Sequence, residues 1–386
     1  MKNNKGITLV ALVVTIVVLL ILAGVSINLV LGNNGIIAKA KEAETKSAEA
    51  SQNDLKGMNG LVSEMEGALA GNGSTGSGSG NGNTGSGNNF VTKNTEVTYP
   101  DGKVWIPEGF KVADDSASTV QGGVVIEDKD RNQFVWVPVA TLADYKRTAY
   151  STNVATEETD TATNSIKINY SSSKNSEYFT EALPEDEKTS VERYKGFYIG
   201  RYEAGDKENT EAKTLRSSND VIKTVTIKAN QAPYNNVTKT QAISLAEGFA
   251  TKQGYKAKTK LVSSYAWDTT IAFLQKVNSD YGNSSEEGNY RDTTFSYTDI
   301  TGTSKTKESD DEVLVPTGQT TPVCNIYDMG GNVDEWTTEF CSYTNYPYAR
   351  RGGFYDGNFA SYPAGNRNGS SDGADVYSGF RLTLFM

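Results

Sequence analysis

The sequence contains no histidine and only two cysteines. Without histidine the chain can form neither a Ser/His/Asp or Cys/His catalytic arrangement nor a histidine-containing zinc or non-haem iron site. Cys324 and Cys341 are too few for a disulfide framework or a four-cysteine metal site, and they leave open either one bridge or two buried thiols. Much of known enzyme chemistry is therefore excluded.

Basic residues are also in short supply. The 386 residues include 37 Lys and Arg against 47 Asp and Glu, which gives a formal net charge of -10. Nucleic acids bind clustered Lys and Arg, and no basic block occurs after the first five residues. We therefore expect no nucleic-acid partner, and the length leaves room for two or three modules.

One long apolar run lies near the N-terminus. The uncharged stretch "ITLVALVVTIVVLLILAGV" begins at Ile7, and at about 1.5 Å per residue a helix of this length crosses the roughly 30 Å hydrocarbon core of a membrane. Lys2 and Lys5 precede it, so the start of the chain is expected in the cytoplasm. Residues 7–31 are thus predicted to be a single membrane-spanning helix, with everything after Leu31 outside the cytoplasm.

The residues "KGITLVALVVTI" resemble the prepilin-type N-terminal motif of type IV pilins. The resemblance implies a leader of residues 1–6, cleavage by a prepilin peptidase between Gly6 and Ile7, and contacts with other pilin-like subunits. Most major pilins have Glu at the fifth mature position, where this chain has Ala11, so filament assembly stays open. A plain membrane anchor is the alternative.

Two segments separate this helix from the rest of the chain. Residues 32–70 place apolar side chains three or four positions apart, as a helical stem would. Residues 71–89 contain only Gly, Ser, Asn and Thr, a composition that cannot bury enough surface to fold, so we predict a flexible linker.

Residues 90–386 have the pattern of a mixed α+β domain. Short runs rich in β-branched and aromatic residues predict strands, and they read "KVWIP", "GGVVIED", "QFVWVPV", "GFYIGRYE", "IKTVTIKA" and "SGFRLTLF". Helices are predicted over 238–253 and 266–280, and the second offers Trp267, Ile271, Phe273, Leu274 and Val277 for a buried face. Two polar insertions, 149–178 and 281–309, are predicted to be surface loops or locally disordered.

Several motifs of this domain occur in a characteristic order. The segments "GFYIGRYEAG", "AWD", "PVCNIYDMGGNVDEWTTEF", "RRGGFYDG" and "SGFRL" together resemble the formylglycine-generating-enzyme-like domain, a variant of the C-type-lectin fold. The resemblance covers roughly residues 104–384. It implies a C-type-lectin-like head carried on the pilin-like helix.

The same resemblance raises the question of catalysis. Formylglycine-generating enzymes bind copper through a cysteine pair that follows the "RGG" segment, because a soft thiolate holds Cu(I) well. Here the corresponding positions fall near Gly357 and Tyr362, so we expect no copper and no such catalysis. Asp334 and Glu335 are neighbours in a predicted strand and point to opposite faces, which makes them a poor acid/base pair. An enzyme with formylglycine-generating or related oxidase activity remains one alternative, and a structural minor pilin or pseudopilin is another.

The segment between "RGG" and "GFR", residues 354–379, carries the functional prediction. Its position resembles the diversified region of variable proteins from diversity-generating retroelements, in which template adenines are mutagenised. An Asn codon changed at its first two positions cannot give Lys, Glu, Gln, Met or Trp, and none of the five occurs in the segment. An ordinary Gly/Asn-rich loop is the alternative.

The resemblance and a paratope-like mixture of aromatic and small polar residues predict a ligand-binding surface. The chain would then display it at the cell surface to an unknown macromolecular or cell-surface ligand. Its predicted residues are Phe354, Tyr355, Asp356, Asn358, Phe359, Ser361, Tyr362, Asn366, Asn368, Asp372, Asp375 and Tyr377.

The motif "YDMGGNVDEW" resembles a calcium site of the formylglycine-generating family. The resemblance implies side-chain ligands from Asp328 and Glu335 and backbone ligands from Gly331 and Val333, and hard oxygen donors suit calcium. The alternative is a turn in which glycines adopt unusual backbone angles, Asn332 caps the chain and Trp336 fills the core.

Overall fold

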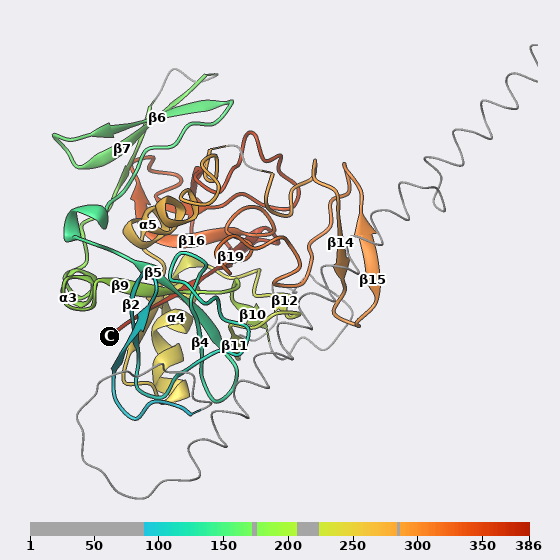
Figure 1. Cartoon of the computed structure of the whole chain (residues 1–386). Helices are drawn as coiled ribbons and strands as arrows, with labels where there is room; N and C mark the ends of the chain where they lie inside the picture. The colour runs from blue at the N-terminus through green and yellow to red at the C-terminus, as the bar shows by residue number, and fades with distance from the viewer. Residues whose placement is uncertain (1–88, 172–175, 207–223, 284–285) are drawn as a thin grey trace, which may run out of the picture. The chain divides into compact units, whose positions relative to one another are not determined.

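The computed structural model describes residues 89–171, 176–206, 224–283 and 286–386. The predicted leader, membrane helix and stem, and all of the linker except its last residue, lie outside these ranges. Among the described residues, no helix has the length and apolar character needed to cross a membrane. The described part is a mixed α and β structure rich in sheet, as the strand and helix patterns predict (Figure 1).

A six-stranded antiparallel sheet forms the centre of the domain. Its strands, in spatial order, are β13 (Lys258–Leu261), β20 (Leu382–Phe385), β9 (Gly196–Gly200), β5 (Gln133–Pro138), β4 (Val125–Glu127) and β3 (Lys111–Val112). Alternation in β5 sends Phe134 and Trp136 into one apolar cluster and Val135 and Val137 into another. Both faces of the sheet are therefore covered.

Helices cover these two faces. The helices are α3 (Glu185–Tyr194), α4 (Lys239–Gln253) and α5 (Ser264–Leu274), and the single 3-10 turn described is η1 (Leu142–Asp144). In Figure 1, α5 lies above and α4 below the middle of the central sheet, and each contributes to one of the two clusters. Thr238 begins α4 because its hydroxyl accepts a hydrogen bond from the Gln241 amide at 3.1 Å while the Gln241 side chain accepts from the Thr238 amide at 3.0 Å.

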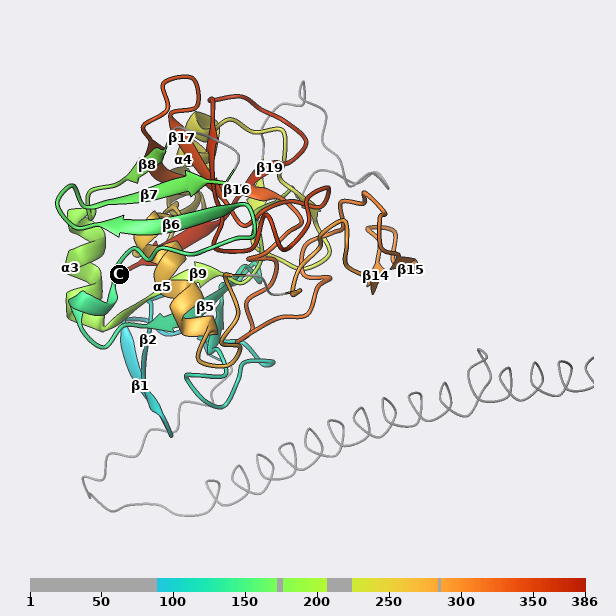
Figure 2. The same ribbon diagram turned by 90° about the horizontal axis from the view of Figure 1, so that it is seen from above.

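A second sheet supports the C-terminal segment. Its members are β18 (Arg367–Ser370), β17 (Tyr348–Arg351), β16 (Asp334–Cys341), β8 (Glu177–Thr180), β7 (Ser165–Tyr170), β6 (Ala155–Asp160) and β19 (Ser378–Phe380). Strand β19 pairs in parallel with β16, whereas the other neighbours are antiparallel. Figure 2 shows β6, β7 and β8 as a green ribbon at the edge of this sheet. Residues 354–379 thus leave the sheet after β17, pass through β18 and rejoin it at β19.

Smaller pairings complete the described structure. They are the hairpin of β1 (Thr95–Tyr99) and β2 (Gly102–Ile106), the three short strands β10 (Gly205–Asp206), β11 (Val225–Thr226) and β12 (Ala232–Pro233), and the hairpin of β14 (Phe295–Thr298) and β15 (Ser304–Lys307).

Both polar insertions contain strands, which corrects the prediction of loops. The insertion 149–178 supplies β6, β7 and the start of β8, because Ile166 and Ile168 alternate with polar residues and bury against Cys341 and Ala349. The insertion 281–309 supplies the β14–β15 hairpin, whose turn is held by the Asp299 carboxylate. In each insertion the alternating apolar residues are too few to predict a strand from the sequence.

The second predicted helix ends earlier than expected. Helix α5 stops at Leu274, and Val277, assigned to its buried face, is 63% exposed. After Leu274 the chain continues in turns, in which the Lys276 and Val277 amides donate to the carbonyls of Phe273 and Leu274, three residues earlier. The Asn278 side-chain oxygen then accepts from the Asp280 amide at 3.2 Å.

Candidate ligand-binding surface

A frame of buried ion pairs lies beneath the C-terminal segment. Arg351 is the last residue of β17, and Arg367 is the first residue of β18. Both bind the Asp268 carboxylate of α5, and the distance from Arg351 Nη2 to Asp268 Oδ1 is 2.6 Å. Arg367 also donates from Nε to Glu339 on β16 at 3.1 Å and from Nη1 to Glu157 on β6. All five side chains are buried. Breaking such a pair would leave an uncompensated charge, so the network fixes how the segment leaves and re-enters the sheet.

The two glycines after Arg351 begin the segment with left-handed backbone. Gly352 has φ 97° and Gly353 has φ 74°. A Cβ on Gly353 would lie 2.1 Å from the Tyr362 carbonyl oxygen, a distance no side chain tolerates. The glycines therefore allow the close crossing of the chain on which the next residues depend.

Four aromatic residues of the segment form a cluster. The Phe354 ring centroid lies 5.0 Å from that of Tyr377 and 5.4 Å from that of Tyr362, and Tyr355 lies 5.4 Å from Tyr377. Phe354, Tyr362 and Tyr377 are partly exposed, whereas Tyr355 is buried against Leu314 and Val333. Burial raises the pKa of Tyr355 to about 12, so its phenol is neutral at physiological pH. We call Phe354, Tyr355, Tyr362 and Tyr377 the aromatic cluster.

Other predicted residues border the cluster. Asp356 accepts from the Tyr377 hydroxyl at 3.4 Å and lies 3.7 Å from the Arg291 guanidinium. Phe359 packs edge-on to Tyr290 at 6.4 Å, and Asn358 accepts from the Ser361 amide at 2.9 Å. These contacts bring most of residues 354–362 to one partly exposed surface.

The remaining predicted residues divide into two groups. Ser361 and Asn366, like Tyr355, are buried and contribute to the framework rather than to an exposed surface. Asp372, which is exposed, and Asp375 and Asn368, which are partly exposed, are tied to Thr240, Arg350 and Asp334 respectively. Asp375 is also linked to the aromatic cluster, because its carboxylate accepts from the Tyr377 amide at 3.0 Å.

The motif "GGNVDEW" is part of the scaffold that holds both ends of the segment. Gly331 and Asn332 have φ 71° and 58°, and the Asn332 side chain donates to Glu203 at 2.7 Å. The Asn332 carbonyl accepts from the Tyr355 amide at 3.1 Å, and the Asp334 amide donates to the Tyr377 carbonyl at 2.7 Å. Trp336 is fully buried, so the motif fits the turn-and-core alternative.

Carboxylates in the motif have separate partners. The Asp334 carboxylate accepts from Asn368 and lies near Arg350, whereas Glu335 accepts from Arg381 at 2.7 Å. This is the placement expected of neighbours in a strand.

Two of the residues predicted to bind calcium, Asp328 and Glu335, contact the Arg381 guanidinium. Both Glu335 oxygens accept from Arg381, whose Nη2 also donates to the Asp328 carbonyl at 2.9 Å. The Asp328 carboxylate accepts from the Thr320 hydroxyl and the Gly318 amide. Burial raises the pKa of Asp328 and raises that of Glu335 to about 7. As arranged, the set does not fit a calcium ion, and in the described part of the chain no three Asp, Glu or Cys side chains are grouped to hold a metal.

The two cysteines, for which a bridge and two thiols both remained open, are free and buried. Burial raises the pKa of each thiol to about 11, so both are protonated near neutral pH.

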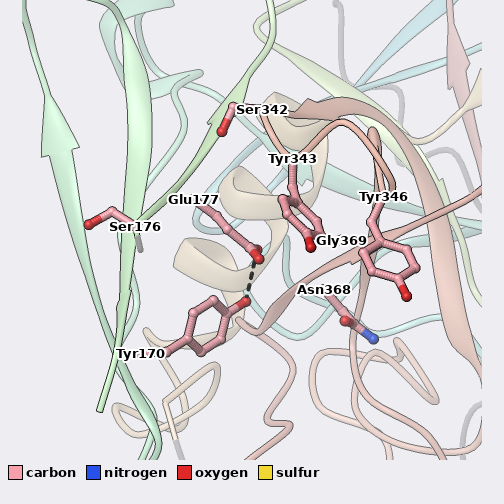
Figure 3. Close-up of a pocket in the computed structure, with 8 residues that line it drawn as sticks. All are labelled: Tyr170, Ser176, Glu177, Ser342, Tyr343, Tyr346, Asn368 and Gly369. Carbon is pink, nitrogen blue, oxygen red and sulfur yellow. Dashed lines mark hydrogen bonds between the residues drawn. The ribbon is translucent and has the colours of Figure 1, made fainter. Parts of the chain in front are cut away.

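A pocket of about 540 Å³ lies beside the segment and was missed by sequence reasoning (Figure 3). Its lining residues are Tyr170, Ser176, Glu177, Ser342, Tyr343, Tyr346, Asn368 and Gly369. Only the last two belong to residues 354–379. The tyrosine-rich stretch "CSYTNYPYARR" was the available signal, but its partners come from the insertion predicted to be a loop.

Comparisons with known proteins found only weak structural similarity. No family model and no curated protein matches the chain. Among solved structures, PvdO from Pseudomonas aeruginosa is 16% identical, with 68% of this chain and 98% of PvdO covered and a TM-score of 0.37. CarF is 15% identical, with 50% and 87% covered and a TM-score of 0.34. Treponema denticola variable protein 1 is 14% identical, with 60% and 99% covered and a TM-score of 0.29. At this level of likeness the three structures establish no family membership.

Proposed function

We propose that the chain is a ligand-binding protein of the cell surface, and that residues 354–379 form its recognition surface on a C-type-lectin-like head. The observation that carries this proposal is the aromatic cluster, in which Phe354, Tyr362 and Tyr377 are partly exposed while the chain beneath them is fixed by buried ion pairs. The function is recognition, with no turnover of the ligand.

Physical chemistry favours this use of the segment. Tyr and Phe offer large contact areas and lose little conformational entropy on binding, and Asn, Ser and Gly between them supply adaptable hydrogen bonds. A rigid frame lowers the ordering cost of binding, because the rings are held near each other before a ligand arrives. Side chains on the surface can also change without disturbing Arg351 or Arg367 below them.

The chemistry of the cysteines supports binding rather than copper-dependent oxidation. Cu(I) sites of the formylglycine-generating kind need a pair of thiolates, whereas Cys324 and Cys341 are free and pack in two different apolar clusters. Neither cysteine belongs to residues 354–379, in which the positions corresponding to the catalytic pair fall near Gly357 and Tyr362.

We further propose that residues 7–31 anchor the protein in a membrane with the head outside the cytoplasm. This part of the proposal rests on the uncharged length of the run and on the lysines before it. Processing after Gly6 is part of the same proposal.

The DNA around the coding sequence tests whether the surface is diversified. We expect a reverse transcriptase gene and a near-copy of the segment encoding residues 354–379, with differences from the coding copy confined to template adenines. A genomic neighbourhood with neither element would contradict diversification, and a near-copy with differences at all four bases would also contradict it.

A further inference from the structure

The pocket of Figure 3 is bounded by three tyrosines and one carboxylate. Tyr170 lies on β7, Glu177 on β8, and Tyr343 and Tyr346 on the turn between β16 and β17. The Tyr343 and Tyr346 ring centroids lie 5.4 Å apart with planes tilted by 32°. These rings are 44% and 48% exposed, so their faces are available to a ligand.

The turn that carries the two rings is held in place by backbone contacts. The Ser342 amide donates to the Tyr178 carbonyl at 2.8 Å, and the Ser342 hydroxyl accepts from the Tyr178 amide at 2.9 Å. Across the turn, the Tyr346 amide donates to the Tyr343 carbonyl at 2.9 Å. The backbone that carries the two rings is therefore in place before any ligand binds, which reduces the entropy lost on binding.

Charge at the pocket has one sign. Glu177 is the only ionisable carboxylate among the eight lining residues, and none of the eight is Lys or Arg. The Tyr170 hydroxyl donates to Glu177 Oε2 at 3.2 Å, and the Cys341 thiol lies 3.9 Å from the same oxygen. Both contacts use Oε2, so Oε1 is the carboxylate oxygen left for a ligand.

The orientation of Glu177 is stable near neutral pH. Burial and the neighbouring Glu177 raise the pKa of Tyr170, which keeps its phenol protonated and able to donate to the carboxylate. The Asn368 side chain is also fixed, because its Nδ2 donates to Asp334 Oδ2 at 3.0 Å.

We propose that this pocket binds an organic cation, an alkylammonium group held between the Glu177 carboxylate and the faces of Tyr343 and Tyr346. A cation over an aromatic face is attracted by the quadrupole of the ring, and a nearby carboxylate adds a direct ionic contact. A sugar or other neutral ligand would use the rings but not the charge. The inference goes beyond the proposed function and does not depend on diversification, since six of the eight lining residues lie outside residues 354–379.

The test is a calorimetric titration of the full-length chain with choline and with its neutral carbon isostere, 3,3-dimethyl-1-butanol. We expect saturable binding of choline and at least about tenfold weaker binding of the isostere, because only choline carries the charge. Nα-acetyl-lysine amide, titrated in parallel, identifies the source of the group. Binding of the lysine amide points to a protein partner, and binding of choline alone points to a small quaternary ammonium ligand.

Single variants measure separately how much the Glu177 charge and the Tyr346 ring contribute to choline affinity. Glu177→Gln removes the charge while keeping an acceptor for Tyr170, and we expect about a tenfold loss of choline affinity. Tyr346→Leu, at a half-exposed ring whose loss leaves the core intact, should weaken binding about threefold. Glu158→Gln, an exposed carboxylate on β6 that does not line the pocket, is the matched control and should bind like the parent protein.

Three results would overturn the proposal: equal binding of choline and the isostere, no saturable binding of either cation, or unchanged affinity in both folded pocket variants. None of these results bears on whether residues 354–379 are diversified, so the two proposals fail separately.

Discussion

At the scale of single residues, arginine divides the molecule into a buried frame and an exposed surface. Arg351 and Arg367 bind carboxylates from α5, β6 and β16 at sites without solvent access. Arg291, in contrast, is 42% exposed and lies 3.7 Å from Asp356. The same residue type thus has two roles that burial distinguishes.

This contrast predicts different costs for the same substitution. Arg367→Met should lower the free energy of unfolding by about 3 to 5 kcal/mol, because Glu157 would stay buried without a cation, and Asp268 and Glu339 would each lose one of their cations. The matched change Arg291→Met should cost less than about 1 kcal/mol. Urea denaturation measures both. Similar costs for the two variants would show that the buried network does not act as a frame.

The place of Arg381 predicts how the protein responds to calcium. Its guanidinium occupies the oxygens of Glu335 and the Asp328 carbonyl, so added calcium should leave the thermal midpoint unchanged, and EDTA should do the same. Differential scanning calorimetry with and without millimolar calcium provides the measurement. A midpoint that rises with calcium and falls with EDTA would restore the calcium site implied by the sequence resemblance.

At the scale of elements, sequence patterns predicted the long and strongly apolar segments well. The strands β4, β5, β9 and β20 and the helix α4 fall within the predicted stretches, and β2 begins one residue before its stretch. Short strands in polar insertions were missed, because only Ile166 and Ile168 mark the buried face of β7. The pocket was missed for the same reason, since Tyr170 and Glu177 meet Tyr343 only through pairing between β8 and β16. Contacts between distant strands leave no local signal.

The contribution of Glu181 to the stability of the fold is expected to depend on pH. Glu181, between β8 and α3, accepts from the Ser264 amide at 2.7 Å at the start of α5 and from the Thr338 hydroxyl on β16. Burial raises the pKa of Glu181 from 4.5 to about 7. The folded protein therefore binds this proton more tightly than the unfolded chain, and the stability it contributes is lost as pH rises from about 4.5 through 7.

Glu181→Gln should remove this loss. We expect the variant to be more stable than the parent protein by about 1 to 3 kcal/mol at pH 8 and similar to it at pH 4. Exposed Glu158→Gln serves as the control and should leave the pH profile unchanged. If the difference between Glu181→Gln and the parent is the same at both pH values, Glu181 does not titrate in this range.

At the scale of the whole molecule, the proposal joins a membrane anchor to a head that carries both the aromatic cluster and the pocket. The anchor is predicted from the sequence alone, because residues 7–31 lie outside the described structure. The C-terminal segment is described, and its frame explains how a Gly- and Asn-rich stretch keeps a defined surface.

Cell fractionation tests the anchor. The full-length chain should sediment with membranes and resist extraction by high salt, because about 20 apolar residues partition strongly into lipid. A variant lacking residues 1–31 should be released. Full-length protein that leaves the membrane fraction in high salt would contradict the anchor while leaving the account of the head untouched.

The most direct test of the central claim is to sequence the coding segment for residues 351–381, which includes the predicted recognition segment 354–379 and the flanking arginines, across many cells of one population. The account predicts substitutions at partly exposed positions such as Phe354, Tyr362 and Tyr377, at codons that match template adenines, with Arg351, Arg367 and Arg381 unchanged. An invariant segment would contradict the claim, as would substitutions that fall equally on the aromatic cluster and on the buried arginines.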